Sequence, residues 1–196
     1  MKNALVVVDV QNDFIPPSGA LAVPNGEEVI PIINKIAPMF DIVVATQDWH
    51  PRNHSSFKEF GGIWPVHCVQ GTFGAELHED LDIEPDLYDK VGTEVDNEGY
   101  SAFDDSSLET WLVDQGVNTL FFAGLATDYC VKESVLDGLR HKFKSYVVSD
   151  GCRAVEVNEG DEKKAYQEME AAGAIITTSA GIADLLRSMN RKSSKR

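Results

Sequence analysis

The sequence has few cysteines, few basic residues and no long apolar run. Its three cysteines, Cys68, Cys130 and Cys152, form an odd set without C-x-x-C spacing, which argues against a disulfide framework and favours a reducing compartment. No apolar window approaches the roughly 20 residues that a membrane-spanning helix needs, and the opening stretch MKNALVVVDV carries no signal-peptide cleavage site. We therefore expect a cytoplasmic protein with no membrane partner.

Basic residues are also scarce, with 17 Lys and Arg against 32 Asp and Glu and a formal net charge of -15. Nucleic-acid binding needs clustered cations that neutralise phosphates, so we expect no nucleic-acid partner. The only cluster of basic residues lies at the end of the chain. We expect one domain over residues 1–187 and a basic, flexible tail over 188–196, to which we assign no function.

The rest of the composition is that of an ordinary globular domain. The chain has 196 residues, of which 43% are apolar and 25% charged, and it contains no repeat or low-complexity segment. One hydrophobic core is workable at this length. A single domain is therefore expected.

Strand-like and helical patterns alternate along the chain. Apolar runs without strict alternation, as strands covered on both faces require, lie at 4–8, 42–45, 87–91, 120–123, 146–148 and 174–177. Helical patterns lie at 29–36, 108–115, 130–139, 162–172 and 182–189. The sequence therefore predicts an α/β fold, Rossmann-like in layout, with a six-stranded, mostly parallel sheet flanked by helices on both faces.

Reactive side chains lie where several of these strands end. Asp9 follows LVVV, Asp48 follows VVATQ, Lys90 lies in or just after the third strand, and Cys130 follows FFAGLATDY. In open parallel sheets, ligands bind outside the carboxyl ends of the strands. We therefore expect these four side chains at one edge of the sheet.

Cys130 is the candidate nucleophile, although a buried, inert cysteine is the usual state of this residue type. The segment GLATDYC is typical of a strand-to-helix turn with Thr127 as a possible N-cap, which places Cys130 in the first helical turn. Unpaired N–H groups there lower a thiol pKa and can bind an oxyanion.

Asp9 and Lys90 are the candidate partners of this thiol. A carboxylate beside a thiol can accept its proton, but it raises the thiol pKa unless a cation offsets the repulsion, and Lys90 is the candidate cation. Each also has an ordinary interpretation: an acid at a strand end often caps a turn, and most lysines are solvated.

The loop TQDWHPRNHSSF crowds metal-binding side chains after a strand. Asp48 and His50, with His67 from the segment WPVHC, can close around one divalent ion, and His54 is a further candidate. Two surface histidines without a metal are the alternative. No H-E-x-x-H segment is present, so a metalloprotease would lack its general base.

Taken together, DVQNDF, QDWH, WPVHCVQGT, DKVG with YSAF, and GLATDYCV resemble the nicotinamidases of the isochorismatase-like cysteine hydrolase superfamily. The resemblance runs in family order from residue 4 to about 155. It implies the isochorismatase-like fold and a catalytic triad of Asp9, Lys90 and Cys130. It also implies an oxyanion hole from the N–H groups of Ala126 and Cys130, after a cis peptide between Leu125 and Ala126.

The metal ligands that the resemblance implies are Asp48, His50 and His67, with His54 ligating directly or through water. We expect one divalent ion, Zn in the first place with Fe or Mn open, and the resemblance implies that it anchors a pyridine nitrogen. The aromatic residues expected to line the substrate pocket are Phe14, Trp64 and Tyr100, although three aromatics in a protein of this size more often belong to the core. One departure is the single Gly19 after Pro17-Ser18, where members often have a Gly-Gly pair.

The implied reaction is hydrolysis of nicotinamide to nicotinate and ammonia through a Cys thioester, in NAD salvage, with pyrazinamide as a further substrate. Two alternatives stay open: another small-amide or carbamoyl hydrolase of the superfamily, and a non-catalytic metal-binding protein. No G-x-G-x-x-G follows the first strand, which disfavours dinucleotide binding. A homo-oligomer is neither indicated nor excluded.

Overall fold

A single parallel β-sheet forms the middle layer of the protein, whose computed structural model describes residues 2–104 and 107–193. Within those residues the sheet has six strands in the order β3-β2-β1-β4-β5-β6, and every strand pairing in it is parallel. The strands are β1 (Lys2–Val8), β2 (Ile42–Asp48), β3 (Leu87–Val91), β4 (Val117–Leu125), β5 (Lys144–Arg153) and β6 (Ile175–Thr177). The predicted sheet is confirmed, and it is wholly rather than mostly parallel.

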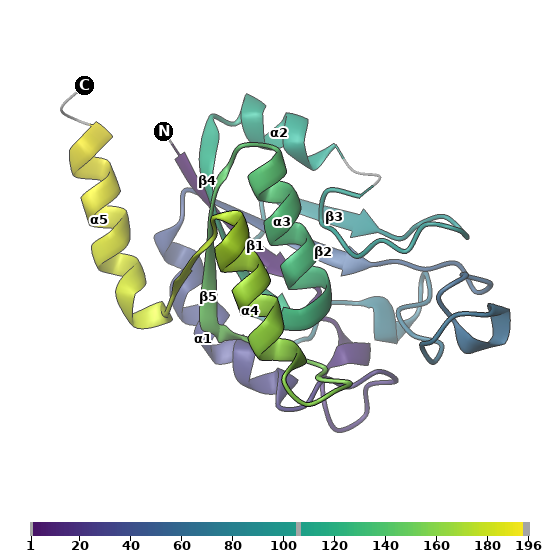
Figure 1. Cartoon of the computed structure of the whole chain (residues 1–196). Helices are drawn as coiled ribbons and strands as arrows, with labels where there is room; N and C mark the ends of the chain where they lie inside the picture. Colours follow the sequence, from purple (N-terminus) through teal and green to yellow (C-terminus); the bar gives the residue numbers. More distant parts are fainter. Residues whose placement is uncertain (1, 105–106, 194–196) are drawn as a thin grey trace.

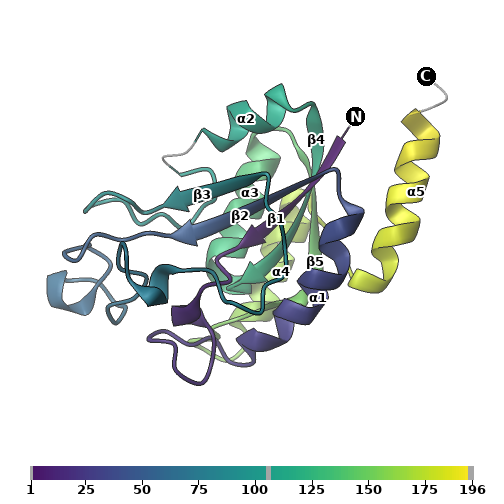
Figure 2. The same ribbon diagram turned by 180° about the vertical axis from the view of Figure 1, so that it is seen from behind.

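Helices cover both faces of the sheet, as predicted (Figure 1 and Figure 2). They are α1 (Val29–Ile36), α2 (Leu108–Asp114), α3 (Lys132–Arg140), α4 (Asp161–Ala172) and α5 (Ile182–Ser193). One face carries α1 and α5, and the other carries α2, α3 and α4. None of the helices in the described residues has the length and apolarity needed to cross a bilayer.

Two apolar clusters fill the spaces between the layers, and β1 shows why its sequence is continuously hydrophobic. Leu5 and Val7 belong to the cluster beneath α1 and α5, here called the α1-side cluster. Ala4 and Val6 belong to the cluster beneath α2, α3 and α4, the α3-side cluster. Successive residues of a strand point to opposite faces, so a strand covered on both sides must be apolar at every position.

Local sequence features set where the helices begin and end. Pro31 lies in the first turn of α1, where its missing N–H costs no intrahelical hydrogen bond. Gly116 follows α2 with a φ of 76°, a left-handed conformation that glycine adopts without steric cost. The last helix continues to Ser193, four residues beyond the predicted Met189, so the first part of the segment 188–196 is helical; residues 194–196 lie outside the described residues.

The strand register places four strand ends side by side. Val7 pairs with Ala45, Val8 with Gly124, and Asp48 with Val91. Because the strands are all parallel, the carboxyl ends of β1, β2, β3 and β4 meet at one edge of the sheet.

Candidate active site and metal centre

Asp9, Asp48 and Cys130 converge at this edge. Asp9 follows β1, Asp48 ends β2, and Cys130 lies in the π-helical turn Thr127–Val131 that follows β4. A carboxylate oxygen of each acid and the Sγ of Cys130 all lie within 4.8 Å of one another, and all three residues are buried. The predicted convergence of these three side chains is therefore present.

Asp9 is hydrogen-bonded to β2 through Thr46. The Thr46 hydroxyl donates to Asp9 Oδ1 at 2.6 Å, and the Asp9 N–H donates to Thr46 Oγ1 at 3.2 Å. Burial, followed by the negative charge of Asp48, raises the pKa of Asp9 from 3.8 to about 8, although the bonds to Thr46 and Cys130 act in the opposite direction. Asp9 can therefore both hold and release a proton near neutral pH.

The Cys130 thiol is the partner of this carboxyl group. Burial, and then the negative charges of Asp9 and Asp48, raise the pKa of Cys130 well above its usual 9.0. The prediction that its helical position lowers the pKa is wrong, because desolvation and two carboxylates outweigh any effect of the turn. Thr127 is not the N-cap either: Ala126 precedes the turn, and the Thr127 hydroxyl lies 3.4 Å from Glu162 Oε1.

Lys90 does not join this pair, contrary to the prediction. Its side chain is exposed, and its Nζ lies 3.4 Å from the centre of the Trp49 ring. Trp49 packs against the α1-side cluster, whereas Cys130 belongs to the α3-side cluster. Lys90 therefore points to the opposite face of the sheet, where its ammonium group interacts with an aromatic ring.

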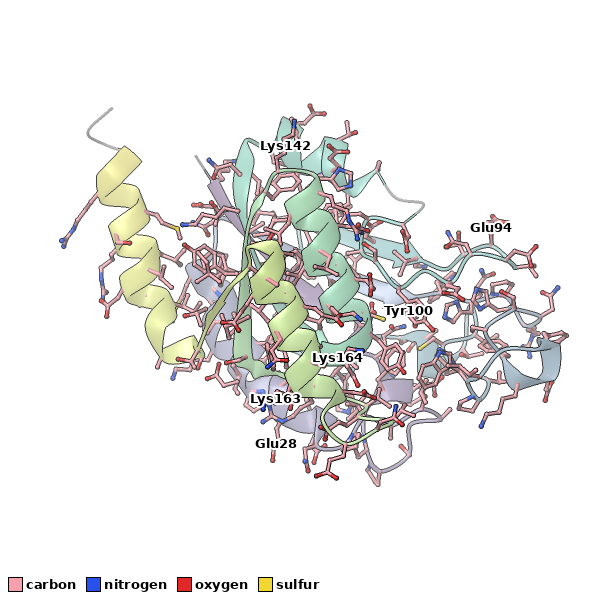
Figure 3. All side chains as sticks on the ribbon, in the orientation of Figure 1. Glu28, Glu94, Tyr100, Lys142, Lys163 and Lys164 are labelled. Carbon is pink, nitrogen blue, oxygen red and sulfur yellow. The ribbon has the colours of Figure 1, made fainter. Side chains whose placement is uncertain are left out.

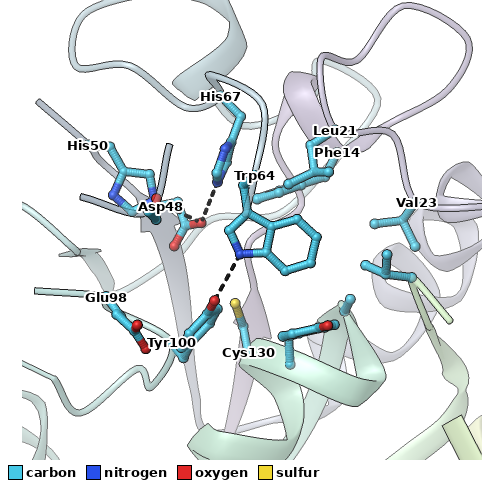
Figure 4. A pocket seen from close by; sticks show the side chains of 14 residues that line it. Phe14, Leu21, Val23, Asp48, His50, Trp64, His67, Glu98, Tyr100 and Cys130 are labelled. Carbon is cyan, nitrogen blue, oxygen red and sulfur yellow. Dashed lines mark hydrogen bonds and ion pairs between the residues drawn. The ribbon is translucent and has the colours of Figure 1, made fainter. Parts of the chain in front are cut away.

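Asp48, His50 and His67 form a second group, one that can hold a metal ion (Figure 4). His50 Nε2 lies 3.3 Å and His67 Nε2 lies 3.7 Å from Asp48 Oδ2. His50 Nδ1 donates to the Gly92 carbonyl at 2.9 Å, and His67 Nδ1 donates to the Pro65 carbonyl at 2.8 Å. These backbone bonds fix the tautomer of both rings and direct both Nε2 atoms at the same carboxylate, as in protein metal sites.

Asp48 shows that a cation fits this group. Its Oδ1 is one of the buried side-chain oxygens in the described residues with no hydrogen-bond partner, although a buried charged oxygen without a partner is costly. Burial alone would raise the pKa of Asp48, but hydrogen bonds from His50 and His67 outweigh it and lower that pKa to about 2. An ionised carboxylate and two imidazoles are a typical donor set for a divalent transition metal.

His54 lies beside these three ligands but directs neither ring nitrogen toward them. Its ring stacks on His50 with centroids 4.0 Å apart. Its Nδ1 accepts from the Ser56 hydroxyl at 2.7 Å, and its Nε2 donates to the Asn97 carbonyl at 2.6 Å. Burial, and then the nearby His50, lower the pKa of His54, so it is a neutral support for His50 in this arrangement.

Two residues of the DVQNDF segment hold the ligand loops, a role that the sequence did not reveal. The Gln11 side chain bonds both sides of the Asp48 backbone: it donates to the Asp48 carbonyl and accepts from the Asp48 N–H, each at 2.8 Å. Asp13 Oδ2 accepts from the N–H of Cys68 at 2.7 Å, immediately after His67. The segment that supplies Asp9 therefore also positions two of the candidate metal ligands.

One cavity connects Cys130 with the metal ligands, and the three aromatic residues predicted as walls all line it. Phe14 packs against His67 with ring centroids 5.6 Å apart, and Trp64 Nε1 donates to the Tyr100 hydroxyl at 2.8 Å. Tyr100, which is labelled in Figure 3, lines the same cavity as Asp48, His50 and His67. Lining residues that the sequence did not reveal are Leu21, Val23, Ser56, Glu98, Tyr129 and Val155.

The backbone around Cys130 has the predicted form. The peptide between Leu125 and Ala126 is cis, and Ala126 lines the cavity with Cys130. The use of their N–H groups as an oxyanion hole stays a prediction. Leu21 and Val23 come from the loop after the single Gly19, so this loop does border the cavity.

Comparison with known proteins now identifies the family. Residues 3–181 match the Isochorismatase domain family. The chain belongs to the isochorismatase family. Because the match covers nearly all of the described strands and helices, the acid–thiol pair and the metal group lie within the family domain.

Individual members of the isochorismatase family resemble the chain over most of its length. It is 40% identical to the nicotinamidase of Escherichia coli, across 90% of this chain and 95% of that protein. A crystal structure of the pyrazinamidase of Pyrococcus horikoshii in complex with zinc is 42% identical, with a TM-score of 0.85, 91% of this chain covered and 99% of that one. The PnC1 protein of L. infantum, solved in complex with nicotinate, is 34% identical with a TM-score of 0.88, covering 91% of this chain and 93% of that one.

Proposed function

We propose that the protein is a nicotinamidase, which hydrolyses nicotinamide to nicotinate and ammonia and serves NAD salvage. The observation that carries the proposal is that Cys130, which lies beside the buried Asp9, lines the same cavity as Asp48, His50 and His67. A thiol alone suits many amide hydrolases, but the adjacent metal group suits a substrate with its own ligand atom. The nicotinamidase and the nicotinate complex among its relatives support this assignment.

In the proposed mechanism Cys130 attacks the carboxamide carbon, and Asp9 takes the thiol proton in the same step. The coupling is needed because the thiol pKa is raised and the free thiolate is disfavoured beside two carboxylates. Protonated Asp9 then gives its proton to the departing nitrogen, which leaves as ammonia and a thioester remains. Water, deprotonated by Asp9, releases nicotinate and restores the thiol. The N–H groups of Ala126 and Cys130 are proposed to bind the carbonyl oxygen.

We propose that Asp48, His50 and His67 hold one divalent ion. Such an ion supplies a Lewis-acidic position at which a pyridine nitrogen is a suitable ligand. Zinc is favoured because the Pyrococcus relative was solved with it, while Fe and Mn stay open. His54 is proposed to act through His50, on which it stacks.

The aromatic walls are proposed to orient the ring of the substrate. Phe14, Trp64 and Tyr100 present apolar surface on the cavity, and the Trp64–Tyr100 hydrogen bond holds two of them in place. A flat heteroaromatic amide fits such walls. Pyrazinamide, whose ring also has a nitrogen placed for the ion, is proposed as a second substrate.

The proposal is tested by incubating the metal-loaded protein with nicotinamide and measuring ammonia and nicotinate, with Cys130→Ala as control. We expect equal amounts of both products from the wild type and none from the variant. Benzamide, which lacks the ring nitrogen, should be hydrolysed far less well. Equal rates on both amides would contradict the anchoring role, and turnover of an N-carbamoyl amino acid in place of nicotinamide would favour the carbamoyl-hydrolase alternative.

A cytoplasmic location and the domain boundary at residue 187 are further proposals. The cysteines of the described residues are free thiols, which supports a reducing compartment. Self-association is left open, and size-exclusion chromatography with light scattering measures it directly.

A further inference from the structure

The acid–thiol pair lies in strongly negative surroundings. Asp9 and Asp48 both approach the Sγ of Cys130 within 4.8 Å. Of the cavity-lining residues in the described ranges, none is Lys or Arg, while Glu98 adds a further acid. When the pair holds one proton, it carries one negative charge, on Asp9 or on Cys130. No ammonium or guanidinium group among the lining residues neutralises this charge.

The strand register shows which residue lies where a cation could interact with the Asp9–Cys130 pair. Val44 and Leu87 are register partners and both border the α3-side cluster, which also holds Cys130. Asp48 lies four residues after Val44, and Val91 lies four residues after Leu87. Because side chains alternate along a strand, Asp48 and Val91 face the same side of the sheet as Val44 and Leu87. Lys90, one residue before Val91, faces Trp49 on the other side.

Val91 is a buried neighbour of the site, with 1% of its surface exposed. It is the register partner of Asp48 on β2. The Asp9 carboxylate accepts a hydrogen bond from Thr46, which also lies on β2. Neighbouring strands lie about 4.8 Å apart, a distance that the four-carbon stem of a lysine can span. A lysine at 91, unlike one at 90, would thus be on the correct face to reach the Asp9–Cys130 pair.

We propose that Val91 fills the position from which an ammonium group would serve the Asp9–Cys130 pair, so that this chain uses an acid–thiol pair without a lysine partner. The inference rests on the proposed nucleophile, but it does not depend on the identity of the substrate. Its consequence is a thiol of restrained reactivity, because no ammonium group offsets the negative charge that the thiolate shares with Asp9. Lys90 has no part in this chemistry.

Selective alkylation of Cys130 tests the proposal in the metal-loaded protein. The rate of labelling by iodoacetamide at pH 7 is followed by mass spectrometry of the peptide that contains Cys130. Four proteins are compared: wild type, Lys90→Met, Val91→Lys, and Val91→Met as an uncharged control of similar length. We expect Lys90→Met to match the wild type, Val91→Lys to react about tenfold faster, and Val91→Met to show no such gain.

Two results would overturn the proposal. A fall of about tenfold in Lys90→Met would show that Lys90 is the working cation after all. A folded Val91→Lys protein that reacts no faster than Val91→Met would show that a side chain at position 91 does not reach the Asp9–Cys130 pair. Lys90 is exposed, so Lys90→Met tests the proposal even if a buried lysine at 91 prevents folding.

The same variants separate this inference from the proposed function. Labelling needs no substrate, so a protein that releases no ammonia from nicotinamide can still show the predicted order of labelling rates. If nicotinamide is the substrate, kcat/KM should follow that order: unchanged in Lys90→Met and increased in Val91→Lys. Turnover of nicotinamide with a reversed order would reject the inference alone.

Discussion

At the scale of single residues, the site depends on how one proton is shared between an acid and a thiol. Burial and then the negative charge of Asp48 raise the pKa of Asp9, and burial followed by the charges of Asp9 and Asp48 raises the pKa of Cys130. Ionisation of either group is unfavourable, so in the reactive form the two groups share one proton. The Thr46 hydroxyl, which donates to Asp9 Oδ1, is the neutral group that favours the ionised acid.

Replacing the proposed nucleophile should separate chemistry from folding. Cys130→Ala removes one buried sulfur atom, which costs about 1 kcal/mol of stability or less, while thioester formation becomes impossible. Ammonia release should fall to background with the melting temperature little changed. A variant that keeps its full rate would end the assignment of Cys130 as nucleophile.

Asp9→Asn should stabilise the metal-free protein, and more so at higher pH. The folded protein holds the Asp9 proton up to about pH 8, whereas the unfolded chain loses it near 3.8. The unfolded state therefore binds fewer protons over this interval, and wild-type stability falls as the pH rises from about 4 to about 8, by at most about 1.4 kcal/mol per unit. Asn does not titrate.

The stability difference between Asp9→Asn and wild type should thus grow from pH 4 to pH 8 and level off above that. Thermal melts in the presence of chelator measure it. Asp48 does not interfere, because its lowered pKa of about 2 confines its own contribution to pH values below about 4. A difference that stays constant across the interval would contradict the buried state of Asp9.

At the scale of structural elements, the turn after β1 organises the neighbouring loops. Gln11 pairs with the Asp48 backbone and also donates to the Ala75 carbonyl at 2.9 Å. Asp13 holds the backbone beside His67 through Cys68. The same short segment therefore ties the end of β2 and the loop that carries His67 to the strand that supplies Asp9.

Gln11→Met should weaken metal binding although it changes no ligand. The side chain is fully buried, and its loss leaves the Asp48 N–H without its partner, at about 1 to 3 kcal/mol, while the Ala75 carbonyl keeps its hydrogen bond from Gln47 Nε2 at 2.8 Å. Positioning groups of this kind typically change metal affinity by about 10- to 100-fold. Competition with a chromogenic chelator measures it.

Asn12→Ala is the matched control for Gln11→Met. Asn12 is the next residue, and its amide donates to the Phe73 carbonyl at an exposed position away from the ligands. Metal affinity should be unchanged in this variant. Equal losses in both variants would mean that the turn as a whole, rather than the bond to Asp48, sets the affinity.

Gly92→Ala should displace His50. Gly92 has a φ of 61°, and a Cβ built there would lie 2.5 Å from His50 Cε1, while the Gly92 carbonyl accepts the His50 Nδ1 proton. Both the backbone conformation and the close approach require glycine. We expect lower metal affinity with the fold retained, measured by the same competition assay and by circular dichroism; an unchanged affinity would show that His50 tolerates the shift.

At the scale of the whole molecule, the parallel sheet places the candidate metal ligands at and beyond its carboxyl edge. Asp48 ends β2, but His50 and His67 lie in the connection between β2 and β3. A bound ion would tie this long connection to the sheet. It would also offset part of the net charge of -15 at the place where buried carboxylates gather.

Metal binding should therefore stabilise the entire domain. An ion at 100 times its Kd adds about 2.7 kcal/mol to the free energy of unfolding if it binds the folded state alone. Adding zinc to chelated protein should raise the melting temperature and restore ammonia release, and His67→Ala should show neither effect. A melting temperature insensitive to both chelator and zinc would reject the metal centre.

Particular residues show how far the sequence alone could predict the site. The sequence predicts that Asp9, Asp48 and Cys130 meet because each follows a recognisable apolar run, and parallel strands bring such ends together. It does not predict the direction of Lys90, because side chains alternate along a strand and a shift of one residue moves a group to the opposite face. It does not reveal the role of Gln11, because the partners of Gln11, Asp48 and Ala75, are distant in sequence.

The sequence by itself determined the layered parallel sheet and the edge where its chemistry gathers, since strands buried on both faces must be apolar throughout and leave polar residues to their ends. Only the tertiary structure decided which side chains at that edge meet. Val91 rather than Lys90 faces the acid–thiol pair, and both imidazoles point at Asp48, because strand register and backbone carbonyls far apart in the chain set those directions.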